Sequence, residues 1–193
     1  MRACAPPARP VDEVGPRDAP FGTVARQLAA GVAVLTAGPA PTACGVTVST
    51  LTLVSYTPPL VSVVLRRGSG SVAHLKRVGG FAANVLAADQ ERLARYFADP
   101  CRPPGMGQLA EDSWRPGDRG PLLCGAIGWL ECRLEQVIPA GDHELLLGRV
   151  QAARLCRGLP LVSFAGRLHP GGPELMDVHP PDRGGRHDDA PDS

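Results

Sequence analysis

The stretch Leu130-Glu131-Cys132-Arg133-Leu134-Glu135 alternates apolar and charged side chains without a break. Successive side chains of a strand point to opposite faces of its sheet, so the pattern over residues 126–138 predicts a half-exposed strand. Two further strand-like segments, 145–153 and 161–165, follow with no helical pattern between them. Consecutive strands of this kind are typical of an antiparallel sheet or barrel and argue against a doubly wound α/β sheet.

The first half of the chain also contains strand-like segments, with short helical ones between them. The break at Gly38-Pro39-Ala40-Pro41 separates two strands that we expect to pair antiparallel. Ser71 and Asp89 are predicted helix caps, and Glu91 and Arg95 form a predicted ion pair one helical turn apart. The expected strands are 32–37, 43–50, 60–66 and 80–86, and the expected helices are 21–28, 71–78 and 89–98. We therefore predict a mostly β chain with short helices, closed or partly closed into an antiparallel barrel.

Composition limits the class of protein. The 193 residues carry a formal net charge of +1, which indicates neither a nucleic-acid nor a membrane partner. No apolar run approaches the ~20 residues of a membrane helix, and residues 1–7 lack the apolar core of a signal peptide, so we expect a cytoplasmic protein. The six cysteines have neither zinc-site nor redox spacing, so we expect reduced thiols and no metal site.

The two ends of the chain differ from its middle. Residues 1–20 are rich in proline, and residues 170–193 consist largely of Pro, Gly, Asp, Arg and His. Such segments bury too little apolar surface to offset chain entropy, so we predict disordered tails around one domain at 21–169. Within that domain, residues 99–121 are predicted to form a long loop, and loops of this length are often functional.

Residues 68–73, Gly-Ser-Gly-Ser-Val-Ala, match the G-x-G-x-x-A pattern of dinucleotide-binding proteins. That fold requires repeated strand–helix–strand units, whereas the second half of this chain has consecutive strands. Small residues before a helix nevertheless leave free N–H groups that suit a phosphate, and Arg66 and Arg67 lie just upstream. The alternative is a plain Gly/Ser turn with solvated arginines.

Polar residues in three other places are candidates for a site. Thr47, Ser49 and Thr50 place hydroxyls along a predicted strand, where they could equally form its outward face. Asn84 lies inside an apolar strand, so its amide needs either a backbone or a cofactor partner. Gly141-Asp142-His143 sets an imidazole after a turn, where it could also be a structural histidine.

In their order and spacing these segments resemble the FMN-binding split-barrel flavin reductases. This family provides the NAD(P)H:flavin oxidoreductase component of two-component flavin-dependent monooxygenases. The resemblance covers about residues 21–169. It rests on 28–36, 45–51, 54–55, 58–61, 79–87 with Gln90, Leu93 and Phe97, 141–143, 147–148 and 160–161. It implies an FMN-binding split β-barrel, antiparallel and Greek-key-like, and a homodimer in which two subunits share each flavin pocket.

The resemblance also implies roles for individual residues. In the family, the hydroxyl-bearing strand lines the isoalloxazine ring, partly through backbone groups, and the turn after the third strand holds the ribityl and phosphate. The implied cofactor-binding residues are Thr47, Val48, Ser49, Thr50, Arg66, Arg67, Ser69, Ser71 and Asn84. The implied catalytic residues are His143, beside the hydride path, and Asp142, which fixes its turn.

The chain departs from the family pattern at the phosphate turn. Gly68 and Gly70 stand where the family has a serine and an arginine, and Arg66 replaces a common asparagine. Leu168 and His169 stand where an aromatic residue often follows. These departures concern the phosphate end and the C-terminal wall of the implied pocket.

The implied activity is reduction of FMN or FAD by hydride transfer from NADH or NADPH. The reduced flavin would pass to a partner monooxygenase, for example in a biosynthetic pathway. Two alternatives keep the split barrel: a flavin-binding protein without reductase activity, and an enzyme recruited to a different reaction. A structural β-barrel module is a third. Oxidation of NADH in the presence of added flavin separates the flavin reductase hypothesis from these three alternatives.

Overall fold

The computed structural model describes residues 19–40 and 42–171. The predicted tails, 1–20 and 170–193, lie almost wholly outside these residues and stay predictions. The helices are α1 (Ala19–Ala25), α2 (Gly70–Val78) and α3 (Glu91–Ala98), with a 3-10 turn at Glu111–Ser113. The strands are β1 (Ala30–Gly31), β2 (Ala33–Ala37), β3 (Cys44–Val48), β4 (Thr52–Tyr56), β5 (Pro59–Arg66), β6 (Gly80–Val85), β7 (Trp114–Arg115), β8 (Leu122–Leu123), β9 (Gly128–Ala140), β10 (His143–Leu155), β11 (Leu161–Phe164) and β12 (Arg167–Pro170).

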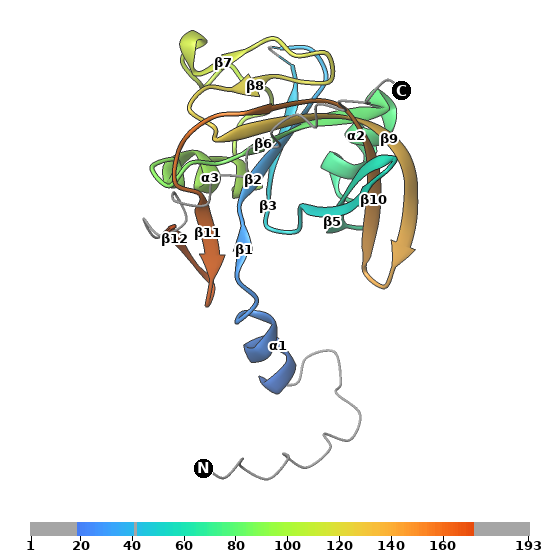
Figure 1. Cartoon of the computed structure of the whole chain (residues 1–193), viewed down its shortest axis with the longest axis vertical. Coiled ribbons are helices and arrows are strands. Elements are labelled where there is room, and N and C mark those ends of the chain that lie inside the picture. The colour runs from blue at the N-terminus through green and yellow to red at the C-terminus, as the bar shows by residue number, and fades with distance from the viewer. Residues whose placement is uncertain (1–18, 41, 172–193) are drawn as a thin grey trace, which may run out of the picture.

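Seven strands form one antiparallel sheet in the order β3-β2-β6-β9-β10-β5-β4 (Figure 1). The sheet curls until the end of β3 meets β5. There the Thr50 hydroxyl donates to Val64 O at 3.1 Å and accepts from Val64 N at 3.0 Å. A sheet closed on itself in this way is a barrel, so the prediction of a mostly β, antiparallel barrel with short helices is confirmed.

The strand β2 explains how the barrel holds its outer elements, because both of its faces are buried. Leu35 points into the barrel core with Phe81 and Leu146. Val34 points the opposite way, into a second core under α3 with Phe97 and neighbouring residues. Alternation along one strand thus fixes α3 to the outside of the barrel wall.

Burial makes Cys132 a packing residue and not a reactive thiol. Cys132 on β9 lies in the barrel core, and this burial raises the pKa of its thiol to about 12. It is therefore a packing residue at neutral pH. All five described cysteines are free.

Both predicted helix caps are wrong. The N-cap of α2 is Ser69, whose extended backbone (φ −68°, ψ 146°) lets its hydroxyl accept from Val72 N at 3.4 Å. The N-cap position of α3 is Gln90, which makes no side-chain cap bond. Gln90 instead accepts from Ala87 N and donates to Cys124 O. The Glu91–Arg95 ion pair is confirmed, at 2.6 Å.

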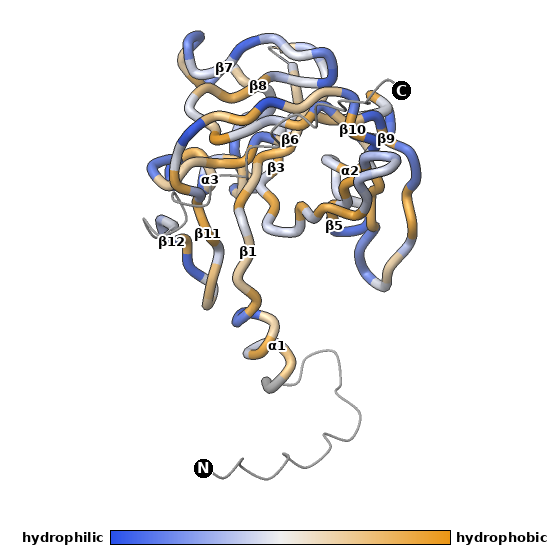
Figure 2. Tube along the Cα trace, in the orientation of Figure 1, coloured by the Kyte–Doolittle hydropathy of each residue, from blue (hydrophilic) through white to orange (hydrophobic). Residues whose placement is uncertain are grey.

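Helix α1 begins two residues earlier than expected, ends at Ala25, and stands apart from the barrel beyond β1 (Figure 1). Its Phe21 and Val24 are exposed, as is Leu28 just after it. Apolar colouring continues from α1 along β1 and reappears on β5 and β11 (Figure 2). In the described part of the chain, no helix is long and apolar enough to cross a membrane.

Candidate functional site

The turn between β9 and β10 presents the predicted catalytic pair. His143 pairs with Ala140 across a two-residue turn, and Gly141 takes a φ of 61° at its first position, where glycine is favoured. The Asp142 Oδ1 atom lies 2.7 Å from His143 Nδ1. This hydrogen bond, followed by the charges of His143 and Arg66, holds the pKa of the Asp142 carboxyl below its ordinary 3.8. Asp142 therefore orients the imidazole and leaves Nε2 as the nitrogen that can meet a ligand.

The turn after β5, residues 66–71, lies directly against this hairpin. Arg66 pairs with His143 in the sheet, and Arg67 N donates to Asp142 O at 3.0 Å. Both arginine side chains are exposed. The structure thus brings Arg66, Arg67, Asp142 and His143 together from two segments far apart in the sequence.

The other end of the 66–71 turn lines a cavity of about 460 Å³. Ser69, Gly70 and Ser71 form one wall at the start of α2. A second wall is the beginning of β3, at 44–46, and a third consists of residues 97–100, 102 and 104. Gly45 is required here, because a Cβ at that position would overlap the Phe97 ring. We refer to this hollow as the seam cavity; it lies where the beginning of β3 approaches the start of α2 and the end of α3.

Arg102 is the seam-cavity residue that sequence reasoning missed. It comes from the long loop after α3 and is half-buried in the cavity wall. Its Nη2 donates to Gly45 O at 2.6 Å. A Pro/Gly-rich loop has no residue pattern that predicts where one side chain points. The sequence therefore predicts a functional loop at 99–121 but no role for Arg102.

The hydroxyl-bearing strand is only partly turned toward this region. Ser49 and Thr50 are exposed at the end of β3, and Thr50 is fixed to Val64 on β5. Val48 points into the barrel core, so only its backbone could touch a ligand. The Thr47 hydroxyl donates to Ala94 O at 2.7 Å and fastens β3 to α3.

Asn84 has the backbone partners that were one of its two expected alternatives. It is completely buried, and its Nδ2 donates to Val34 O at 3.1 Å, with longer contacts to Thr36 Oγ1 and Pro121 O. Its Oδ1 accepts from Leu123 N at 2.7 Å. Both polar atoms of the amide are thus paired within the chain, and the residue holds the barrel wall to β8 rather than facing the seam cavity.

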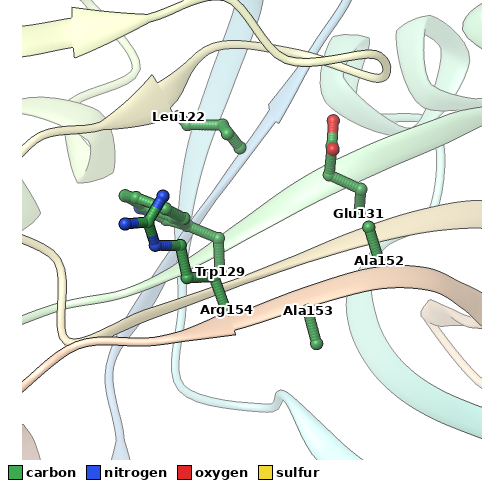
Figure 3. Close-up of a pocket in the computed structure, with 6 residues that line it drawn as sticks. All are labelled: Leu122, Trp129, Glu131, Ala152, Ala153 and Arg154. Carbon is green, nitrogen blue, oxygen red and sulfur yellow. The ribbon is translucent and has the colours of Figure 1, made fainter.

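A second hollow, of about 190 Å³, lies on another part of β9 and β10 (Figure 3). Its floor is the Trp129 ring, over which the guanidinium of Arg154 lies 5.5 Å from the ring centroid. The Trp129 Nε1 atom donates to Leu123 O at 3.1 Å, which makes the indole a packing residue. Its other lining residues are Leu122, Glu131, Ala152 and Ala153, which supply no hydroxyl.

The seam cavity and its adjoining turns suit a polar, phosphate-bearing molecule. Ser69 and Ser71 provide hydroxyls, the first amides of α2 have no acceptor within the helix, and Arg102 provides positive charge. The His143 Nε2 atom and the exposed hydroxyls of Ser49 and Thr50 continue the polar surface beyond the turn. These groups fit a flavin nucleotide with its phosphate at the start of α2.

Comparison with known proteins agrees with that fit. The model of the flavin reductase like domain matches residues 25–172. The chain is 42% identical over 147 residues to an NADPH-flavin oxidoreductase of Streptomyces viridifaciens, which covers 75% of this chain and 76% of that protein. It is 32% identical over 150 residues to the reductase component of a 4-nitrophenol 4-monooxygenase/4-nitrocatechol 2-monooxygenase of Rhodococcus opacus, covering 78% and 79%.

The solved structure of the NADH:FAD oxidoreductase of Streptomyces globisporus C-1027 gives a TM-score of 0.75 at 33% identity. The match covers 87% of this chain and 100% of the Streptomyces globisporus chain. The curled sheet, its outer helices and the seam cavity define a split-barrel protein of the flavin-binding class. The chain belongs to the flavin reductase like domain family, and both the predicted family and the predicted fold are confirmed.

Proposed function

We propose that this protein is an NAD(P)H-dependent flavin reductase. It binds FMN or FAD, reduces it with hydride from NADH or NADPH, and releases reduced flavin to a partner monooxygenase. The observation that carries the proposal is the 66–71 turn. Its first residues contact the Asp142–His143 hairpin and its last residues line the seam cavity, so one short segment links both ends of a flavin-sized site.

In this proposal the chain's own residues bind and orient. Ser69 and Ser71 hold the phosphate, while Ser49 and Thr50 bound the edge of the ring. His143 directs Nε2 at the nicotinamide, and Asp142 keeps that orientation through Nδ1. When bound, the flavin supplies the redox chemistry by accepting the hydride. Since hydride transfer requires reacting atoms about 3–3.5 Å apart, orientation supplies most of the catalysis and no general base is needed.

The test is anaerobic oxidation of NADH and NADPH with FMN, FAD and riboflavin in turn, followed by the loss of nicotinamide absorbance. A reductase that releases its product turns over flavin supplied in large molar excess. A flavin carrier reduces at most one equivalent per site. Tight FMN binding without oxidation of either nicotinamide would exclude the reductase and leave the carrier or a recruited enzyme.

We also propose a homodimer, on the basis of apolar surface that the single chain leaves uncovered. Tyr56 on β4 and Leu155 at the end of β10 are 83% and 80% exposed. Leu53 and Tyr56 line a mostly apolar groove of about 490 Å³, which extends to Val150 and Ala153 on β10. Exposed apolar surface of this kind is typical of a protein interface, and α1 adds Phe21 and Val24. A second copy of the chain is the proposed occupant, and analytical ultracentrifugation tests it.

The proposed monooxygenase partner is supported by the relative from Rhodococcus opacus, which is itself named as a reductase component. The five cysteines in the described part of the chain are unpaired, which suits a reducing compartment and supports the cytoplasm as the proposed location. A reconstitution with a flavin-dependent monooxygenase, supplied with NADH and flavin, tests the partner. Product formation must then depend on this protein.

A further inference from the structure

Arg102 holds a fixed positive charge in the wall of the seam cavity. Its Nη1 donates to Pro103 O at 3.1 Å and to Gly105 O at 3.3 Å, and its Nη2 donates to Gly45 O at 2.6 Å. The guanidinium carbon lies 4.9 Å from the Phe97 ring centroid and 5.4 Å from that of Tyr96. Because three hydrogen bonds and two rings hold it, the planar group has little freedom left to lose on binding a ligand.

These contacts position the charge without neutralising it. All three acceptors are backbone carbonyl oxygens, which carry no net charge. The carboxylate nearest in sequence, Asp99, also lines the cavity, but its Oδ1 accepts from Cys101 N at 2.8 Å. A half-buried guanidinium with only neutral partners has electrostatic capacity left for an anion.

The turn that faces Arg102 lacks a cation of its own at the cavity end. Arg66 and Arg67 are at the opposite end of the 66–71 turn, beside Asp142, and Arg66 helps to lower the pKa of that carboxyl. At the cavity end, the turn contributes only Ser69, Gly70 and Ser71. The positive charge of the cavity therefore comes from the loop after α3.

We infer that Arg102 binds the phosphate group of the flavin nucleotide, opposite the hydroxyls of Ser69 and Ser71. This inference rests on the proposed function for the nature of the ligand. It makes Arg102 a specificity residue that distinguishes FMN and FAD from riboflavin, which has the same ring and ribityl chain but no phosphate. The ring and the hydride path do not involve it.

The experiment measures equilibrium binding of FMN and riboflavin, by calorimetry without nicotinamide, to wild type, Arg102→Gln and Arg95→Gln. Arg95 is the matched control, since it lies on α3, is exposed, pairs with Glu91 and does not line the cavity. We expect Arg102→Gln to raise the Kd of FMN roughly tenfold or more, the effect of one lost hydrogen bond to a charged group. The Kd of riboflavin should stay within about twofold, and Arg95→Gln should change neither.

Two further variants fix the role as electrostatic. Arg102→Lys keeps the positive charge and should retain more FMN affinity than Arg102→Gln, although it loses the planar set of N–H donors of the guanidinium. Asp99→Asn removes a carboxylate from the same wall and should tighten FMN, but not riboflavin. Should Arg102→Gln fail to fold, Arg102→Lys and Asp99→Asn still give the ratio of the FMN Kd to the riboflavin Kd, on which the inference depends.

Equal weakening of FMN and riboflavin by Arg102→Gln would overturn the inference and leave Arg102 as a structural link between Gly45 and the loop. Unchanged binding of both would overturn it as well. Failure of the proposed function has a different signature. In that case wild type would bind FMN more tightly than riboflavin, with the difference lost in Arg102→Gln, yet would oxidise no nicotinamide.

Discussion

Two polar clusters of this molecule are both candidates for a site in the sequence, and the structure separates them. Around Asn84, every polar atom of the amide meets a partner inside the barrel wall, and the residue is completely buried. Around the 66–71 turn, Arg66 and Arg67 are exposed, and Ser69 and Ser71 line a cavity. The Asn84 amide uses both of its polar atoms to hold the fold. The Ser69 hydroxyl accepts from Val72 N and that of Ser71 from Cys44 Sγ, which leaves each O–H free to donate to a ligand.

The largest expected effect is on stability, at the structural cluster. Asn84→Leu keeps the number and branching of the side-chain heavy atoms but leaves Leu123 N and Val34 O without this partner. We expect a loss of about 3 kcal/mol in the free energy of unfolding, since each buried group left unpaired costs about 1–3 kcal/mol. Thermal unfolding measures it, and a fall in Tm of roughly 10 °C is expected.

Thr36→Val offers a graded control for that prediction, because it removes one hydroxyl that donates to Pro121 O at 2.6 Å in the same buried cluster. It should cost about 1 kcal/mol. Flavin affinity of the folded fraction should be unchanged in both variants. If Asn84→Leu has the Tm of wild type but binds FMN poorly, then Asn84 contacts the ligand and is not a structural residue.

The next effect is on turnover, at the hairpin beside the 66–71 turn. His143→Ala should lower kcat/KM for NADH roughly 10–100-fold, the usual range for one orienting or proton-transferring side chain, and leave the Kd of FMN unchanged. Stopped-flow reduction of bound flavin measures it. Full activity in this variant would remove His143 from the site.

The matched control is His74→Ala. Both ring nitrogens of His74 have partners within the chain, Nε2 with Ala37 O and Nδ1 with Arg77. This variant should melt at a lower temperature and reduce flavin at the normal rate. The two histidines therefore repeat the contrast between the structural and the functional cluster with one residue type.

A smaller effect is expected on assembly. Tyr56→Asp introduces a charge at an 83% exposed position that lines the groove that we assign to the second subunit. Burial of an unpaired carboxylate opposes association, so sedimentation should shift toward the monomer at micromolar concentration. Arg92→Asp, at an exposed position on α3, should sediment like wild type. A wild-type chain that sediments as a monomer would contradict the proposed interface.

The smallest effect concerns pH. The pKa of Asp142 is lowered in the folded protein, so its contribution is present above the unfolded pKa and is lost only as pH falls through the lower, folded pKa. Between about pH 5 and 8 the carboxylate stays ionised, and its bond to His143 should persist. The carboxyl-carbon chemical shift of Asp142, followed by NMR, should therefore stay at its ionised value across that range. A change to the protonated value between about pH 5 and 8 would contradict the lowered pKa.

The sequence predicted the barrel well because its strands carry strong local patterns. The alternation at 130–135 and the apolar runs of β2 and β5 each indicate a strand whatever surrounds them. The edge strand β4 was missed because its exposed residues, 52–56, show no clean alternation between apolar and polar types. The cap of α2 was misplaced because Ser69 and Ser71 lie two residues apart at the start of the helix, and only backbone dihedral angles decide between them.

The site was less accessible to sequence reasoning because it is made of distant segments. The contact of Arg67 with Asp142 depends on strand register, and the cavity joins residues 44–46, 69–71 and 97–104. Arg102 has no motif, and only its place in the folded loop gives it a role. Asn84 shows the reverse problem. Burial requires its amide to have hydrogen-bond partners, but the neighbouring residues in the sequence do not identify them.

The central claim is that the start of α2 and the end of β3 bind one flavin, whose ring ends beside the Asp142–His143 hairpin. A crystal structure of the FMN complex tests it most directly. The account predicts the phosphate between Ser69, Ser71 and Arg102, with the ring running past Thr50 toward His143. An FMN molecule bound instead over Trp129 and Arg154, with the seam cavity filled by side chains, would contradict it.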